Sequence, residues 1–111
     1  MTRVPYDPAL YYAGEDLALA ARAFTHGYEI FHTARAPGWH LCAPADFARH
    51  WEADPAWVAL HALSVAKLRR LFAPEPLISE KDGLGTARTL AEYEARCGLD
   101  LRAALHAALP N

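Results

Sequence analysis

The sequence lacks several features that mark whole classes of protein. It has only two cysteines among 111 residues, Cys42 and Cys97, which form no CxxC pair. This excludes a disulfide framework and favours free thiols in a reducing compartment, with one bridge between them as the alternative. Eleven Lys and Arg against thirteen Asp and Glu give a formal net charge of −2. The chain therefore has no basic excess for nucleic acid or an anionic membrane, and we expect neither as a partner.

Long apolar runs and targeting signals are also missing. The longest apolar stretch, Pro55–Ala66, is too short to cross a bilayer and contains His61. The first eight residues carry no apolar signal region. We therefore expect a soluble, cytoplasmic protein.

What is present is the composition of a single helix-rich domain. Hydrophobic residues make up 53% and charged residues 22% of the chain, which is typical of globular proteins. An apolar stripe and capping residues predict helices over 15–26, from Asp54 to about Phe72, from Thr89 to Gly98 and from Asp100 to about Leu109. We expect residues 45–54 to be irregular or to form one helical turn.

Two short segments favour β-structure. In residues 28–33, Tyr28, Ile30 and His32 fall on one face of an extended chain and the residues between them fall on the other. Residues 39–42 form a weaker second candidate beyond a Pro-Gly turn. Two short strands make a poor sheet alone. The predicted fold is therefore α/β but rich in helix, with two short strands and three or four helices at the edge of a larger α/β body.

Two places could carry chemistry. Glu15 and Asp16 follow a glycine at a predicted helix start, where acids commonly complement the helix dipole on the surface. The alternative is that these carboxylates border a cleft and serve acid/base work or bind sugar hydroxyls. His40 is either a packed core histidine or a metal ligand, and no H-x-x-x-H or H-E-x-x-H spacing supports the second interpretation.

A series of uncommon clusters then occurs in order along the chain. They are Val4-Pro-Tyr-Asp-Pro8, Tyr11-Tyr-Ala-Gly-Glu-Asp16, Leu19-Ala-Ala-Arg22, Thr25-His-Gly-Tyr-Glu-Ile-Phe-His32, Trp39-His40, Arg49-His-Trp51 and Asp82-Gly-Leu-Gly-Thr86, followed by Arg88-Thr-Leu90, Tyr93-Glu94 and Gly98-Leu-Asp100. Together they resemble the C-terminal portion of the glycosyltransferase (GlcNAc) family, of GT-A type.

The resemblance implies a role for each candidate residue. Glu15 would meet the donor sugar or the acceptor hydroxyl, and Asp16 replaces the usual second Glu of the family. His40 would complete the coordination of Mn²⁺ or Mg²⁺ beside a nucleotide diphosphate, where the ion neutralises charge on the leaving phosphate. The chain departs from the family pattern after this histidine, where Leu41-Cys42 replace an acid and an aromatic residue.

The larger departure is that the sequence has no Asp-x-Asp, the motif that supplies metal carboxylates in such enzymes. The resemblance thus implies that residues 1–111 are a single C-terminal segment whose N-terminal nucleotide-binding half is absent, encoded upstream or lost. The implied reaction transfers a sugar from a UDP-sugar to a hydroxyl of a protein or small molecule, with a divalent metal. We expect the isolated chain to be inactive without the Asp-x-Asp half.

Two alternatives stay open. The chain is either a non-catalytic remnant or interaction module, or a small stand-alone helical domain. In the second case Tyr11, Tyr12, Phe31 and Trp57 would form an apolar face that docks a partner.

Overall fold

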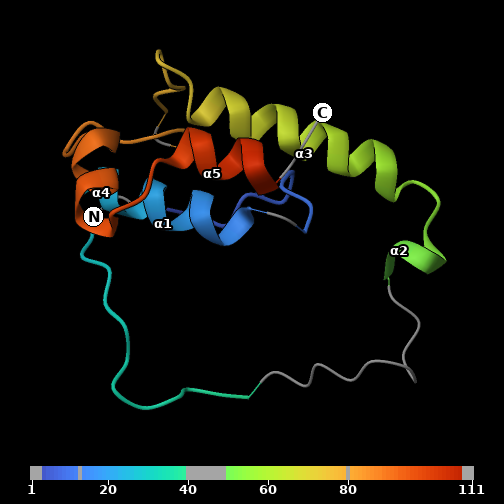
Figure 1. The fold of residues 1–111 in the computed structure, drawn as a ribbon, viewed down its shortest axis with the longest axis horizontal. Coiled ribbons are helices and arrows are strands. Elements are labelled where there is room, and N and C mark those ends of the chain that lie inside the picture. The colour runs from blue at the N-terminus through green and yellow to red at the C-terminus, as the bar shows by residue number, and fades with distance from the viewer. Residues whose placement is uncertain (1–3, 13, 40–49, 80, 109–111) are drawn as a thin grey trace.

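The computed structural model describes residues 4–12, 14–39, 50–79 and 81–108. Within these ranges the chain forms five helices, joined by irregular segments (Figure 1). The helices are α1 (Glu15–Thr25), α2 (His50–Ala53), α3 (Trp57–Leu71), α4 (Leu90–Cys97) and α5 (Leu101–Ala108). None of these helices is long and apolar enough to cross a membrane.

Helix α1 confirms the helix predicted for 15–26, with His26 as its C-cap. It begins after Gly14, whose φ of 84° lies in the left-handed region that favours glycine. Glu15 and Asp16 occupy the first turn, where the helix dipole stabilises negative charge. Gly27, with φ 94°, redirects the chain after the helix.

Helix α3 begins later than the sequence predicts. Asp54 was expected to cap the helix directly, but its Oδ1 accepts a hydrogen bond from the amide of Ala56 (2.9 Å) and its carbonyl oxygen accepts one from Trp57 (3.1 Å). These two bonds form a turn ahead of the helix, because a short Asp side chain readily bonds the backbone two residues on. The helix therefore starts at Trp57, and it ends at Leu71 beside the predicted end.

The two C-terminal helices confirm the capping predictions. The amide of Glu92 donates to the Thr89 hydroxyl (3.2 Å) and the amide of Thr89 donates to the Glu92 carboxylate (2.6 Å), which together form a capping box. Gly98, with φ 66°, ends α4. The Asp100 carboxylate then accepts from the amide of Ala103 (2.9 Å) at the start of α5.

The predicted strands are wrong wherever the structure describes them. Residues 28–33 and Trp39 are irregular, residues 40–42 lie outside the described ranges, and no strand occurs in the described part of the chain. The nearest approach to β-structure there is one parallel bridge between Ile78 and Leu84. A strand needs a neighbour to complete its hydrogen bonds, and among the described residues no backbone group pairs with the backbone of residues 29–33. The described chain is therefore helix-rich rather than α/β.

The core lies where α1 packs against α4 and α3 packs against α5. Leu84, from the loop ahead of α4, and Leu10, from the N-terminal segment, close it. The Phe24 and Tyr93 rings pack across the α1–α4 contact with centroids 5.4 Å apart. The buried apolar residues are Leu10, Ala18, Ala21, Phe24, Val65, Leu68, Leu71, Phe72, Leu84, Tyr93, Leu101 and Leu105.

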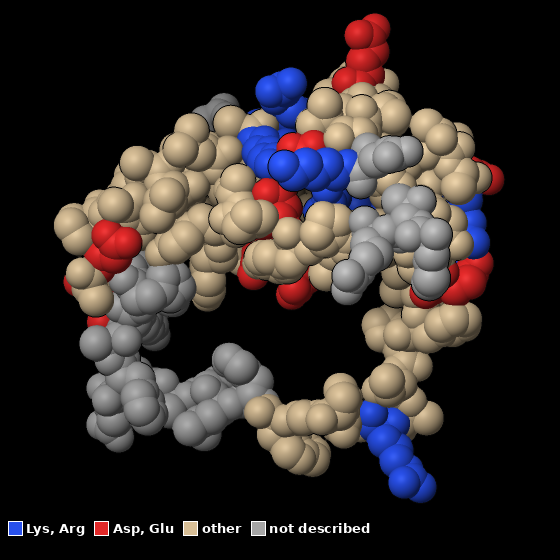
Figure 2. All heavy atoms as spheres, turned by 180° about the vertical axis from the view of Figure 1, so that it is seen from behind, with Lys and Arg blue, Asp and Glu red and all other residues tan. Residues whose placement is uncertain are grey.

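The segment after α1 leaves this core. Residues 29–39 are all exposed, and the chain beyond Ile30 runs away from the helices as an open arc (Figure 1). Phe31 and Trp39 are 78% and 94% exposed, although both are large and apolar. The space-filling view shows open space between the described part of this arc and the helices (Figure 2).

Candidate functional site

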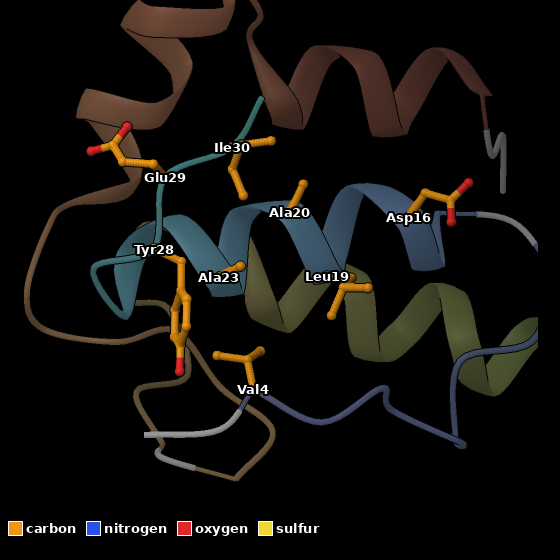
Figure 3. Close-up of a pocket in the computed structure, with 8 residues that line it drawn as sticks. All are labelled: Val4, Asp16, Leu19, Ala20, Ala23, Tyr28, Glu29 and Ile30. Atoms are coloured by element: carbon orange, nitrogen blue, oxygen red, sulfur yellow. The ribbon is translucent and has the colours of Figure 1, made fainter. Parts of the chain in front are cut away.

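A groove of about 890 Å³ runs along the outer face of α1. One wall is α1 itself, and another is the chain at residues 28–30, which follows the turn at Gly27 (Figure 3). Val4 from the N-terminal segment lies at its lower edge in this view. The lining residues are Val4, Asp16, Leu19, Ala20, Ala23, Tyr28, Glu29 and Ile30.

The structure separates the two predicted catalytic carboxylates. Asp16 is exposed and lines the groove, whereas Glu15 is not among the lining residues. Consecutive helical residues point about 100° apart, which accounts for the separation. The Oε2 atom of Glu15 is nevertheless buried and has no hydrogen-bond partner among the described residues. Such an atom is uncommon in native proteins and calls for a ligand or counter-charge.

Tyr6 lies within electrostatic reach of these acids. Burial raises the pKa of its phenol, and the nearby carboxylates of Glu15, Asp16 and Asp7 raise it further, because each disfavours the phenolate. The start of α1 is thus a negatively charged corner with a neutral phenol at its edge.

The predicted metal ligand, His40, lies outside the described residues, so its role stays a prediction. In the described ranges no three side chains of His, Cys, Asp or Glu gather closely enough to hold a metal ion. The apolar face expected from Tyr11, Tyr12, Phe31 and Trp57 comes from three separate parts of the chain, and only Tyr12 and Phe31 are exposed.

An ion pair with a buried carboxylate holds the N-terminal segment, which also contributes Val4 to the groove. The Lys67 ammonium lies 2.6 Å from Oδ2 of Asp7, whose side chain is 6% exposed, and 3.7 Å from Oδ2 of Asp82. Burial tends to raise the pKa of the Asp7 carboxyl, but the hydrogen bonds from Lys67 and from the amide of Ala9 outweigh burial and lower it. Asp82 in turn accepts a hydrogen bond from Ser79 (3.0 Å).

Arg22 adds a second link to the same region. This side chain is 1% exposed, and its guanidinium donates to the carbonyl oxygens of Pro5 (3.0 Å) and Lys81 (2.6 Å). One helix residue therefore binds the N-terminal segment and the loop ahead of α4 together. Sequence reasoning missed this role, because an arginine inside a helix gives no signal that it is buried.

Arg88, from the family-like cluster Arg88-Thr-Leu90, is partly buried in the structure. Its guanidinium donates to the carbonyl oxygen of Tyr28 (3.1 Å), pairs with Glu29 (2.6 Å) and lies 4.6 Å from the centre of the Phe24 ring. Arg96 binds the other carboxylate oxygen of Glu29 (2.8 Å). The hydrogen bond from Arg96, with the charge of Arg88, lowers the pKa of Glu29. Both arginines hold the groove wall at 28–29 against α4.

The Gly83-Leu84-Gly85 loop contacts the C-terminal end of α1. The buried Thr25 hydroxyl accepts from the amide of Gly85 (2.9 Å), and a Cβ at Gly85 would lie 2.5 Å from the Thr25 carbonyl oxygen. Only glycine permits this approach of two backbones. A smaller cavity of about 180 Å³ lies here, lined in part by His26, whose Nε2 is buried without a partner among the described residues.

Comparison of the chain with known proteins identifies its family. The family model described as Glycosyltransferase (GlcNAc) matches residues 1–103. The chain belongs to this family. No curated protein and no solved structure matches it.

The structure gives several residues of the family-like motifs a structural role that the sequence alone did not reveal. Much of what resembles this glycosyltransferase family forms scaffold in the structure, because Asp7, Arg22, Asp82, Gly85 and Arg88 all make the contacts described above. Asp16 and Glu29 are resembling residues that line the groove, and of these two Asp16 has no ion pair with a described residue. A glycosyltransferase takes a sugar donor and an acceptor, so these are the substrates that membership implies in general.

Proposed function

We propose that this chain forms the C-terminal part of a metal-assisted glycosyltransferase that moves an N-acetylglucosamine-type sugar from a UDP-sugar to a hydroxyl group. The observation that carries the proposal is the unpartnered, buried Oε2 of Glu15 next to the groove-lining Asp16, in a chain of this family. Neither Glu15 nor Asp16 forms an ion pair with a described residue, and carboxylates accept hydrogen bonds from hydroxyl groups, so such ligands suit both.

In this proposal the two acids have different tasks. Glu15 accepts a hydrogen bond from a hydroxyl of the donor sugar or of the acceptor. Asp16 takes a proton from an acceptor hydroxyl, a task that its exposure at the groove supports. The acceptor is a protein or a small molecule that carries this hydroxyl.

The described residues do not by themselves fit a divalent cation, since they bring no cluster of three ligand side chains together. Mn²⁺ and Mg²⁺ prefer several oxygen ligands. We therefore propose that carboxylates from another polypeptide hold the ion, with His40 as this chain's contribution. That polypeptide would carry the Asp-x-Asp half, and the two parts together would form a GT-A-type α/β enzyme in the cytoplasm.

Isothermal calorimetry with UDP-GlcNAc and Mn²⁺ tests the proposal. We expect little or no heat with the chain alone, and binding when it is mixed with the protein encoded immediately upstream of its gene. In that mixture Glu15→Gln should weaken sugar binding, while Glu75→Gln, which changes an exposed acid away from the groove, should not. Absence of binding in both samples would contradict a split transferase.

A second candidate is a non-catalytic interaction module. The exposed Phe31 and Trp39 on the arc favour it, because isolated domains rarely leave such residues in water without a partner. Absence of nucleotide-sugar binding in the mixture, together with a stable complex of the two proteins, would support this candidate.

A further inference from the structure

A second pocket lies where α3 packs against α5, and it shares no lining residue with the groove on α1 (Figure 1). Its volume is about 270 Å³. Each helix presents a cation to it together with the residues three and four positions further on, which share a helix face with that cation. These residues are Arg69, Phe72 and Ala73 at the C-terminal end of α3, and Arg102, Leu105 and His106 on α5.

The inner wall of this pocket is apolar. Phe72 and Leu105 are both buried, and Ala73 between the two helices is half-buried. A volume of about 270 Å³ is small for a whole ligand molecule, because such sites usually measure roughly 300–1,000 Å³. It suits a single apolar side chain, the kind of anchor with which one protein fills a pocket of another. The occupant is therefore one side chain of a longer molecule.

The outer part of the pocket is positively charged. Arg69, Arg102 and His106 are exposed, and no Asp or Glu is among its described lining residues. Arg102 and His106 form no ion pair with any described residue. A cationic opening above an apolar wall favours an occupant that carries a carboxylate beside its apolar side chain.

Arg102 is held in position for such a carboxylate. Its Nε donates to the carbonyl oxygen of Phe72 (2.8 Å), which ties α5 to the end of α3. Its two terminal nitrogens make no hydrogen bond with a described residue. By contrast, Arg22, Arg88 and Arg96 use terminal nitrogens for oxygens of the chain itself. The free end of the Arg102 guanidinium matches the two oxygens of one carboxylate.

We propose that the pocket between α3 and α5 is a docking site for an acidic segment of a partner polypeptide. The segment inserts one apolar side chain against Phe72 and Leu105, and a neighbouring carboxylate pairs with Arg102. Both features are required, since an anion alone leaves the apolar wall uncovered and an apolar group alone leaves the guanidinium without an acid. The inference rests on this pocket and is independent of glycosyl transfer.

A second copy of the chain is a poorer fit than a separate partner. Its one exposed large apolar residue followed directly by an acid, among the described residues, is Leu99, ahead of Asp100. The Asp100 carboxylate already accepts a hydrogen bond from the amide of Ala103 (2.9 Å) at the start of α5. Pairing it with Arg102 of another copy would compete with that bond. The oligomeric state is therefore part of the test.

The test titrates a short peptide into the full chain. The probe is acetyl-Gly-Glu-Leu-Asp-Gly-amide, which carries one apolar side chain between two carboxylates. One control replaces both acids with Gln and Asn of the same shape, and the other replaces Leu with Ala. The amide NMR shifts of Ala73 and of α5 report binding, and light scattering reports the mass of the chain. None of the peptide comparisons alters the protein, so folding does not limit them.

We expect the probe to bind with a Kd on the order of millimolar, and each control peptide to bind at least about fivefold more weakly. Arg102→Gln should remove most of the preference for the acidic peptide, whereas Arg70→Gln, at an exposed arginine outside the pocket, should retain it. His106→Glu should weaken the probe at least about fivefold by repulsion. Ala107→Glu adds the same charge at an exposed position outside the pocket and should have little effect.

Four results would overturn the proposal. Equal affinity for the probe and either control peptide would remove the requirement for charge or for the apolar side chain. Equal effects of His106→Glu and Ala107→Glu would reduce the attraction to diffuse charge. Absence of shifts at about 10 mM probe would exclude the site. A dimer that becomes monomeric in Arg102→Gln would assign the pocket to a second copy. Calorimetry with UDP-GlcNAc reports separately on the proposed function, so either inference can fail alone.

Discussion

At the scale of single residues, the ion pair between Asp7 and Lys67 is the contact most open to test. Lys67→Met would leave the 6%-exposed Asp7 carboxylate without its counter-charge. We expect a loss of about 1–3 kcal/mol in the free energy of unfolding, measured by urea titration at neutral pH. Lys81→Met, at an exposed lysine, should change stability by less than about 0.5 kcal/mol. Equal effects of the two variants would contradict a stabilising pair.

The same pair predicts a pH dependence. The pKa of Asp7 is lower in the folded chain than its ordinary value, so the pair contributes fully above about pH 4, the unfolded value. That contribution is lost as pH falls through the lowered pKa of the folded state. The stability difference between wild type and Lys67→Met should therefore be constant from neutral to mildly acidic pH and shrink below about pH 4. A difference that persists undiminished at pH 2 would assign it to packing.

Gly85 offers a second residue-scale test. A Cβ there would lie 2.5 Å from the Thr25 carbonyl oxygen and 2.7 Å from the His26 amide nitrogen, both of them backbone atoms. We expect Gly85→Ala to destabilise the chain by about 1–3 kcal/mol, since one backbone segment must move. Gly38→Ala is the matched control, because nothing lies within 4 Å of its Cβ position. Thermal unfolding of both variants would measure the difference.

At the scale of elements, short-range sequence signals predicted those features that depend only on neighbouring residues. The capping box at Thr89, the glycine that ends α4 and the apolar stripe of α1 are all properties of neighbouring residues, and these helices were found as predicted. Residues 28–33 failed as a strand because a strand depends on a partner that the sequence does not specify. Asp16 at the groove was likewise predictable as an acid at a helix start, whereas the groove itself depends on where the chain turns after Gly27.

The capping box gives the element-scale prediction. Thr89→Ala removes the hydroxyl that accepts from the Glu92 amide, so α4 should lose about 1 kcal/mol of stability. Thr89→Ser keeps the hydroxyl and should stay within about 0.5 kcal/mol of wild type. Exchange of the first α4 amides should quicken in the Ala variant alone. Equal stability of the Ala and Ser variants would mean that α4 is held by its packing on α1.

At the scale of the whole molecule, two cations help to hold the N-terminal segment, α1, α3 and the loop ahead of α4 together. Arg22 binds the N-terminal segment at Pro5 and the loop at Lys81, while Lys67 binds the same two parts through Asp7 and Asp82. Each link joins the N-terminal segment to the loop ahead of α4, Arg22 from α1 and Lys67 from α3. The groove depends on them, since Val4 from the N-terminal segment lines it together with residues of α1 (Figure 3).

This arrangement predicts that the two links are coupled. We expect Arg22→Met and Lys67→Met each to destabilise the chain, but the double variant to lose less than the sum, by about 0.5–3 kcal/mol. Once one link is gone the N-terminal segment frays, so the second has less to hold. The control cycle combines Arg22→Met with Thr89→Ala, whose contacts are separate, and should be additive within about 0.5 kcal/mol. Additivity in both cycles would mean that each link stabilises its own helix locally, and the groove wall at Val4 would then not depend on α3.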